Sequence, residues 1–130
     1  IYHELIQFLA LHNQNDVTVS NDAIALKNYI EQHLLKPLSI EDLAHTIYKS
    51  PAQAIRIFKK NYGITPYEYY IKIKLDKAVT MLENTSFSIK KIAYCLGFCD
   101  DHYFSGLFKK KMGKCPSDYR KNNNELFKKK

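Results

Sequence analysis

Apolar residues recur along this chain at the three- and four-residue spacing of an amphipathic helix. The spacing is clearest in a stripe that stops before Gly97 and consists of Ile89, Ile92, Ala93 and Leu96. It resumes in a second helix that ends at Gly113, whose inner face carries Phe104, Leu107, Phe108 and Met112. Two short helices joined by a tight turn, the second with an exposed polar face, are typical of a helix-turn-helix.

The same pattern occurs earlier in the chain. At an offset of 49 residues, Ser39, Ile40 and Ala44 correspond to Ser88, Ile89 and Ala93. From the turn onward the offset is 50, which matches Phe58, Lys59, Lys60, Gly63, Pro66 and Tyr69 with Phe108, Lys109, Lys110, Gly113, Pro116 and Tyr119. Two copies are too few for a solenoid, so the repetition predicts a tandem pair.

Helix start and stop signals surround the repeated units. A helix is predicted from Asn21 to Leu35, ended by Pro37, and another over residues 51–62 between a Ser50 capping box and Gly63. The longest predicted helix starts after Thr65 and continues through Asn84. Because no stretch alternates as a strand would, we expect an all-α fold: two helix-turn-helix subdomains joined by a long central helix, preceded by a short N-terminal helix.

These elements suggest the following organisation of the chain. Residues 1–12 are expected to be the remnant of a preceding domain or an accessory helix, 13–20 a linker, 21–64 the first helix-turn-helix subdomain, 65–84 the connecting helix, 85–120 the second subdomain, and 121–130 a basic, disordered tail.

Basic charge is concentrated in the repeated part of the chain. Residues 1–50 hold three Lys against six Asp or Glu, whereas residues 51–130 hold seventeen Lys or Arg against seven acids. Such a distribution is the electrostatic pattern of a nucleic-acid binder, although a basic surface can also serve solubility alone. The connecting helix would be about 28 Å long, near the spacing of about 34 Å between successive major grooves on one face of DNA, which favours DNA over other acidic partners.

Other chemistries have little support in the sequence. No apolar run approaches a membrane span, no signal peptide opens the chain, and three cysteines without framework spacing fit a reducing, cytoplasmic setting. Cys95, Cys99 and His102 lack a fourth ligand at a zinc-like spacing, and Cys99 near a helix start is at most a redox-sensitive thiol. With no nucleophile motif or phosphate loop, we expect no enzyme, no metal and no cofactor.

Three motifs resemble the AraC/XylS family of bacterial transcription regulators: the repeated S-I-x-x-[LI]-A, the endings F-K-K-x-x-G-x-x-P-x-x-Y, and the block L-G-F-x-D-x-x-Y-F-S-x-x-F-K-K. The resemblance covers about residues 21–120. It implies a seven-helix DNA-binding domain in which the second helix of each unit enters a major groove. Many members carry an N-terminal domain for effector binding or dimerisation.

The resemblance also implies the DNA-contacting residues. The positions expected at base edges are Ala52, Gln53, Ile55 and Arg56 in the first unit, and Asp101, His102, Ser105 and Gly106 in the second. The positions expected at phosphates are Lys59, Lys60, Lys109, Lys110 and Lys111, which could otherwise be solvated faces. Arg56 is the most informative candidate, since arginine pairs with guanine O6 and N7. Gly106 departs from the family pattern, which often has Arg there.

The expected function is therefore a sequence-specific double-stranded DNA-binding transcription regulator, acting as an activator on a promoter or operator. The family implies RNA polymerase as a partner, and homodimerisation through an N-terminal domain upstream of Ile1. Two alternatives stay open: a weakly specific architectural DNA binder, and a helical protein-interaction module with a basic face.

Overall fold

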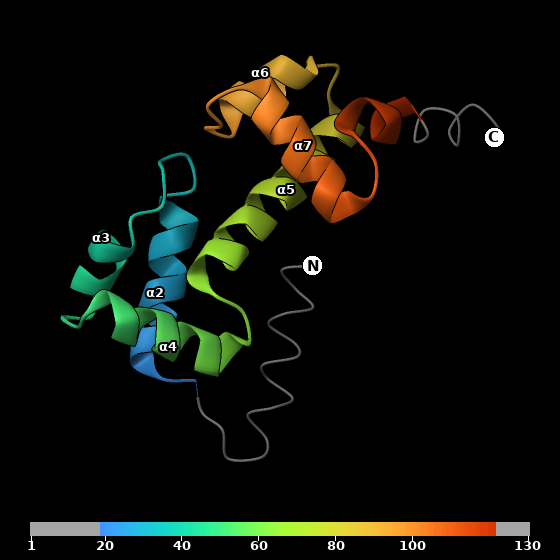
Figure 1. Cartoon of the computed structure of the whole chain (residues 1–130). Coiled ribbons are helices and arrows are strands. Elements are labelled where there is room, and N and C mark those ends of the chain that lie inside the picture. Colours follow the sequence, from blue (N-terminus) through green and yellow to red (C-terminus); the bar gives the residue numbers. More distant parts are fainter. Residues whose placement is uncertain (1–18, 122–130) are drawn as a thin grey trace. The chain divides into compact units, whose positions relative to one another are not determined.

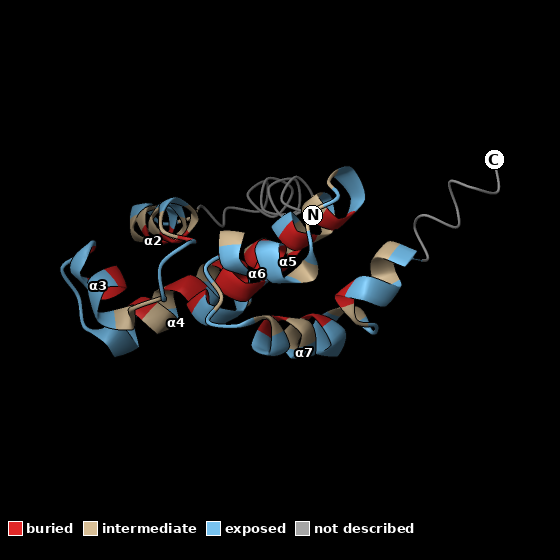
Figure 2. Ribbon diagram, turned by 90° about the horizontal axis from the view of Figure 1, so that it is seen from above, coloured by how far each residue is buried: buried red, intermediate tan, exposed pale blue. Residues whose placement is uncertain are grey.

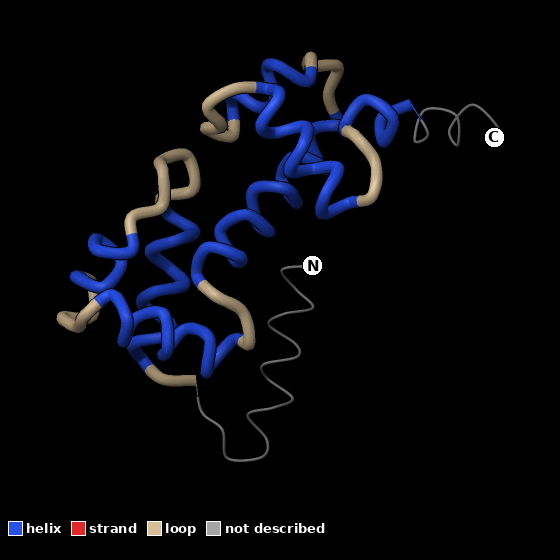
Figure 3. Tube along the Cα trace, in the orientation of Figure 1, coloured by secondary structure: helices blue, strands red, loops and turns tan. Residues whose placement is uncertain are grey.

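Residues 19–121 are described by the structure, a computed structural model, and they form helices and loops without a strand (Figure 3). The helices are α2 (Asn21–Gln32), α3 (Ile40–His45), α4 (Pro51–Tyr62), α5 (Pro66–Asn84), α6 (Ile89–Cys95) and α7 (Asp101–Met112), and residues 116–121 are also helical. The all-α prediction is confirmed. The predictions for residues 1–12, for the linker up to residue 18 and for the tail from residue 122 lie outside the described residues.

The chain divides into two compact units, the first ending at Ile73 and the second beginning at Lys74. The boundary falls inside α5, so that helix contributes its first turns to one unit and its last turns to the other. None of the helices described is long and apolar enough to cross a membrane.

In the first unit α2, α3 and α4 contact one another (Figure 1). The apolar stripes predicted from the sequence meet here, and the buried faces of the helices in this unit are drawn red in Figure 2. The fully buried side chains include Leu26, Ile30, Leu43 and Phe58. The core of this unit is thus the set of positions with helical spacing.

In the second unit α6 packs against α7, and two fully buried rings, Phe104 and Phe108, join the aliphatic side chains of the core. Phe104 stacks at a tilt against Phe98 (5.0 Å between ring centroids) and lies 5.9 Å from Phe108. Phe108 in turn meets Tyr119 edge-on at 5.8 Å. Leu107 and Met112, expected on the inner face, are only half-buried, because Phe104 and Phe108 already fill the space between the helices.

Local capping explains where the helices begin and end. Ser39 and Ser88 accept hydrogen bonds at the N-termini of α3 and α6, and Gly63 and Gly113 adopt positive φ (80° and 87°) at the ends of α4 and α7. Glycine is favoured at these positions because it has no Cβ that would clash in the left-handed conformation.

The end of α2 differs from the prediction. The helix stops at Gln32 instead of Leu35, because the backbone N–H of His33 turns to the carbonyl of Ile30 in a tighter three-residue bond. The His33 ring is 2.8 Å from the Tyr29 carbonyl, which it can satisfy as a donor. Leu34 is nevertheless buried, although it lies beyond the end of the helix.

In each unit, a tyrosine near the C-terminal end donates a hydrogen bond to a glutamate of the unit's first helix. That helix is α2 in the first unit and the last turns of α5 in the second. The Tyr69 hydroxyl donates to Glu31 at 2.6 Å, and the Tyr119 hydroxyl donates to Glu83 at 2.9 Å. The following residue secures the loop after that helix: the Tyr70 hydroxyl donates to the Lys36 carbonyl at 2.6 Å. Its counterpart Arg120 donates to the carbonyls of Leu82, Thr85 and Phe87. The repeat therefore extends beyond the helix-turn-helix.

Candidate nucleic-acid interface

Helix α4 separates its residues cleanly into two faces. Ala54, Phe58 and Tyr62 are buried against the first unit. On the opposite face, the predicted DNA-contacting residues Ala52, Gln53, Arg56, Lys59 and Lys60 are exposed, and Ile55 is half-buried. The structure thus brings the candidates of the first unit onto one accessible helix surface.

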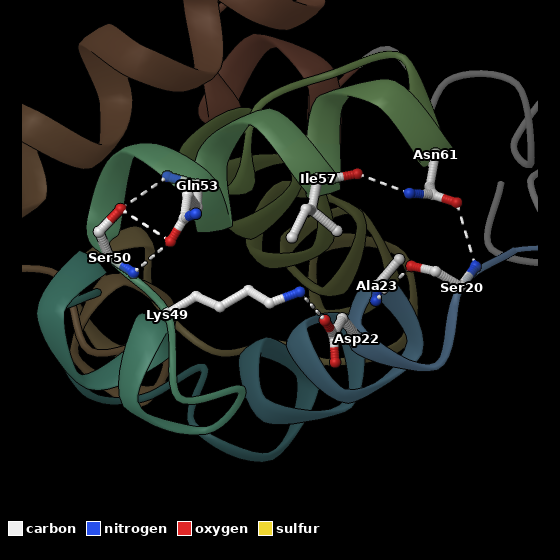
Figure 4. A network of polar contacts seen from close by, with 8 residues as sticks. All are labelled: Ser20, Asp22, Ala23, Lys49, Ser50, Gln53, Ile57 and Asn61. Atoms are coloured by element: carbon white, nitrogen blue, oxygen red, sulfur yellow. Dashed lines mark hydrogen bonds and ion pairs between the residues drawn. The ribbon is translucent and has the colours of Figure 1, made fainter.

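The N-terminal end of α4 is fixed by polar contacts (Figure 4). Ser50 Oγ accepts from the Gln53 N–H at 3.2 Å, and the Ser50 N–H donates to Gln53 Oε1 at 3.0 Å, which completes the predicted capping box. The neighbouring Lys49 ammonium forms an ion pair with Asp22 of α2 at 2.6 Å. Because Gln53 Oε1 accepts from the Ser50 N–H, only the Gln53 amide nitrogen is left to contact a partner.

The C-terminal end of α4 is fixed to the start of α2. Asn61 donates through Nδ2 to the Ile57 carbonyl at 2.7 Å and accepts through Oδ1 from the Ser20 N–H at 3.1 Å. Ser20 is itself the N-cap of α2, as its hydroxyl accepts from the Ala23 N–H. Both ends of α4 are therefore held by the first unit, which orients the exposed face (Figure 4).

Helix α7 has the same two-faced arrangement in the second unit. Phe104 and Phe108 are buried, whereas His102, Gly106, Lys109, Lys110 and Lys111 are exposed, and Asp101 and Ser105 are half-buried. Its N-cap is Asp100, whose carboxylate accepts from the Tyr103 N–H at 2.6 Å. Sequence reasoning missed this cap, although the offset of 50 residues matches Asp100 with Ser50.

Gly106 leaves the middle of the exposed face of α7 without a side chain. A Cβ built at this position meets nothing within 4 Å, so the site has room for a larger residue. At the offset of 50 residues, Gly106 is the counterpart of Arg56. The second unit therefore lacks a side chain where the first presents its guanidinium.

The turns that precede α4 and α7 have matching backbones. Tyr48 and Gly97 both adopt positive φ, at 56° and 77°. The following N–H groups, of Lys49 and Phe98, donate to the carbonyls of Ala44 and Ala93. Cys99 is then the one extra residue of the second turn, which explains why the offset rises from 49 to 50. Sequence analysis did not predict a left-handed tyrosine, but the alignment of Tyr48 with Gly97 was a usable signal.

The side chain that follows the positive-φ residue differs between the turns. Lys49 is exposed and forms its ion pair with Asp22, whereas Phe98 is half-buried and lies under the Lys74 ammonium, 4.9 Å from the ring centroid. Burial lowers the pKa of Lys74, an effect that the nearby Cys99 partly opposes. The first turn is thus held by an ion pair and the second by a ring beneath a buried amine.

Positive charge differs between the described parts of the two units. Residues 19–73 contain seven Lys or Arg against five Asp or Glu, and residues 74–121 contain ten against five. Among the described residues no cluster of His, Cys, Asp and Glu has the geometry of a metal site, and Cys95, Cys99 and Cys115 are free thiols. The prominent chemistry of these surfaces is therefore hydrogen bonding and positive charge.

Known proteins share both the sequence and the fold. A family model described as a helix-turn-helix domain matches residues 43–122. The probable transcriptional regulator LumQ of Photobacterium leiognathi is 31% identical over 97 residues, which cover 75% of this chain and 39% of LumQ. The chain spans less than half the length of LumQ and of other curated relatives that it matches.

Two solved structures are similar in fold. The C-terminal domain of AraT, a response regulator from Geobacillus stearothermophilus, has a TM-score of 0.76 and 33% identity, and the match covers 82% of this chain and 88% of that domain. The DNA-binding domain of the transcriptional factor AdpA has a TM-score of 0.75 at 24% identity, with 82% and 96% covered, a likeness of fold.

A tandem pair of capped helix-turn-helix units with exposed second helices defines a DNA-binding domain of a transcription regulator. The chain belongs to the AraC/XylS family of bacterial transcription regulators, as its motifs indicated.

Proposed function

We propose that this chain is a sequence-specific double-stranded DNA-binding activator that inserts α4 and α7 into successive major grooves. The observation that carries the proposal is the repeated helix with a buried inner face and an exposed polar, basic face. The AdpA domain, which shares the fold, was solved in complex with a target DNA, and this supports a duplex as the partner.

The length of α5 supports the use of two adjacent grooves. Its 19 residues correspond to a helix of about 28 Å. Successive major grooves on one face of DNA are about 34 Å apart. A continuous helix of this size is suitable for joining two reading units that bind neighbouring grooves.

In the first unit, Arg56 is the proposed reader of guanine, because its guanidinium is exposed and can donate to O6 and N7 together. Gln53 can offer only its amide nitrogen, since its oxygen caps α4, so it donates to a purine acceptor instead of making the paired contact to adenine. Ala52 and Ile55 provide apolar contacts for thymine methyl groups.

In the second unit the proposed readers are weaker. His102 can donate to a purine N7 and Ser105 can bond to several bases, whereas Asp101 can accept from cytosine N4 but is repelled by phosphates. Gly106, the counterpart of Arg56, reads nothing. The larger excess of positive charge in residues 74–121 suggests that this unit contributes more to affinity than to sequence preference.

The lysines at the ends of the two helices are assigned to phosphates. Lys59, Lys60, Lys109, Lys110 and Lys111 are all exposed. Phosphate contacts fix the register and orientation of the protein on DNA. They also make affinity depend on salt: the logarithm of the binding constant falls with the logarithm of the salt concentration, with a slope of about 0.9 per neutralised phosphate. We further propose that the regulator acts in the cytoplasm, recruits RNA polymerase, and dimerises through a domain outside this chain.

The test is selection of random duplex DNA by the purified chain, in parallel with Arg56→Ala, Gly106→Arg and Lys60→Ala. Wild type is expected to enrich a site with two blocks one helical turn apart, the first more strongly defined. Arg56→Ala is expected to lose preference in one block only, and Gly106→Arg to add a guanine in the other. Lys60→Ala, the matched control, should weaken all sequences equally and lower the salt slope by about 0.9.

Other outcomes separate the alternatives. Tight, salt-sensitive binding without an enriched sequence would replace specific regulation by an architectural role. Absence of binding to any duplex would overturn the DNA-binding proposal and favour a protein-interaction module.

A further inference from the structure

Tyr48 combines two locally unfavourable features. Its φ of 56° lies in the left-handed region, which is strained for a side chain with a Cβ. Its side chain is 96% exposed, so burial of the ring does not offset that strain. At the matching position of the second unit, Gly97 adopts the same backbone conformation without the steric cost.

The backbone around Tyr48 is well fixed. The Tyr48 N–H donates to the His45 carbonyl at 3.3 Å, and the Lys49 N–H donates to the Ala44 carbonyl at 3.2 Å. Immediately afterwards, Lys49 is paired with Asp22 and Ser50 begins the capping box of α4. An exposed aromatic side chain is therefore presented from a rigid turn, and ordering it against a partner costs little backbone entropy.

Its position suggests the partner. Tyr48 precedes the N-cap Ser50 by two residues, at the end of α4 where the exposed reading face begins. Tyrosine hydroxyls are among the donors that proteins place on DNA phosphates. A neutral donor at this point complements the lysines Lys59 and Lys60, which lie at the opposite end of the same helix.

We propose that the Tyr48 hydroxyl donates a hydrogen bond to a DNA phosphate at the edge of the groove that α4 enters, and so positions that helix. This inference rests on the proposed function. The strained turn of the first unit is then retained for contact with the duplex, whereas the second unit has glycine at the corresponding position and lacks this contact.

The test compares Tyr48→Phe, Tyr48→Gly and a matched control, Tyr94→Phe, at another highly exposed tyrosine (82%) on α6. Affinity for the selected duplex and for a scrambled duplex is measured over a range of salt concentrations. Tyr48→Phe is expected to weaken both by about threefold to tenfold, the size of one neutral hydrogen bond. The salt slope should not change, because a neutral donor releases no counterion. Tyr94→Phe is expected to bind as wild type.

Tyr48→Gly separates binding from folding. It is expected to lose at least as much affinity as Tyr48→Phe while its thermal midpoint rises by about 4 °C, because the left-handed strain is relieved. Unchanged affinity of Tyr48→Phe, in a chain that binds duplex DNA, would overturn the role of Tyr48 alone. A wild-type chain that binds no duplex would overturn the proposed function first.

Discussion

Helices α4 and α7 begin with a side-chain cap and end at a left-handed glycine, yet different interactions hold them. Polar contacts to α2 fix both ends of α4, through the Lys49–Asp22 pair and through Asn61. Phe108 packs against Tyr119 as Phe58 packs against Tyr69 in the first unit. In the second unit Phe104 and Phe98 extend this pair into a row of four rings along α7. The same backbone therefore tolerates two ways of fixing a helix, one based on directional polar contacts and one mainly hydrophobic.

The outer faces of the same two helices differ in a related way. The first unit presents a guanidinium at Arg56 where the second has Gly106. The second unit instead has the larger excess of basic residues. We therefore expect precise orientation to matter most for α4, because directional base contacts depend on angle, whereas phosphate attraction depends mainly on distance.

The largest expected effect comes from removing the central ring of each unit. Phe58→Ala and Phe108→Ala each remove a fully buried side chain and are expected to lower the free energy of unfolding by about 3–5 kcal/mol. Urea unfolding followed by circular dichroism measures the loss. Phe87→Ala, at a half-buried position, is the control and should cost less. A small effect of Phe108→Ala would show that the aromatic row does not support α7.

The next effect compares the two residues that secure the loop after the first helix of each unit. Arg120→Ala removes donors to three carbonyls and is expected to cost about 2 kcal/mol, whereas Tyr70→Phe removes one hydrogen bond and is expected to cost about 1 kcal/mol. The same urea titration measures both. Equal losses in the free energy of unfolding would show that Arg120 stabilises the second unit no more than Tyr70 stabilises the first.

A smaller effect concerns the bare position on α7. Gly106→Ala is expected to raise the free energy of unfolding by up to about 1 kcal/mol, because glycine inside a helix is entropically costly and the added methyl meets nothing. Thermal unfolding provides the measurement, with the helix neighbour Ser105→Ala as control. A destabilised Gly106→Ala chain would mean that this face is covered in the free protein.

The smallest effect is a pH dependence in the second unit. Burial, and then the hydrogen bond and negative charge of Glu83, raise the pKa of the Tyr119 phenol above its ordinary value near 10.0. The folded state therefore holds this proton more tightly than the unfolded chain, so its contribution to stability is present below pH 10 and declines as pH rises through the folded pKa. Solvent screening keeps the effect small.

Free energies of unfolding measured between about pH 8 and pH 11 test this pH dependence. The two limits lie about two pH units below and one above the ordinary pKa of tyrosine. Tyr119→Phe should flatten the alkaline decline, and Glu83→Gln, which keeps an acceptor without the charge, should fall between it and wild type. Identical profiles for all three chains would rule out the linkage.

Much of the fold was predictable because its signals are local. The capping box at Ser50, the glycine after α4 and the spacing of Ile92, Ala93 and Leu96 are set within a few residues of one another. The bounds of α4 and α5 agree with the prediction for the same reason. The exposed face of α4 could also be predicted, because on an amphipathic helix the polar face lies opposite the buried apolar face.

The missed features have different origins. The three carbonyls bound by Arg120 lie 33 to 38 residues away in sequence, so no local pattern indicates these contacts. The early end of α2 instead depends on the local bond from His33 to Ile30, and the half-burial of Leu107 on its neighbours in α7. The left-handed conformation of Tyr48 was hidden because tyrosine rarely adopts it, and only the alignment with Gly97 could have indicated it. The roles of the DNA-contacting residues stay predictions.

The unit boundary inside α5 has a consequence for how the protein can be divided. Split at the boundary, the helix would leave 8 residues (Pro66–Ile73) to one unit and 11 residues (Lys74–Asn84) to the other. Isolated helices shorter than about 12–15 residues are marginal in water, since the first turn is costly to form. Each part of α5 is therefore stabilised by being continuous with the other part, because neither part is long enough to form a stable helix alone. A gene cut into two halves here would yield two weakened pieces, and the domain is inherited most safely as a whole.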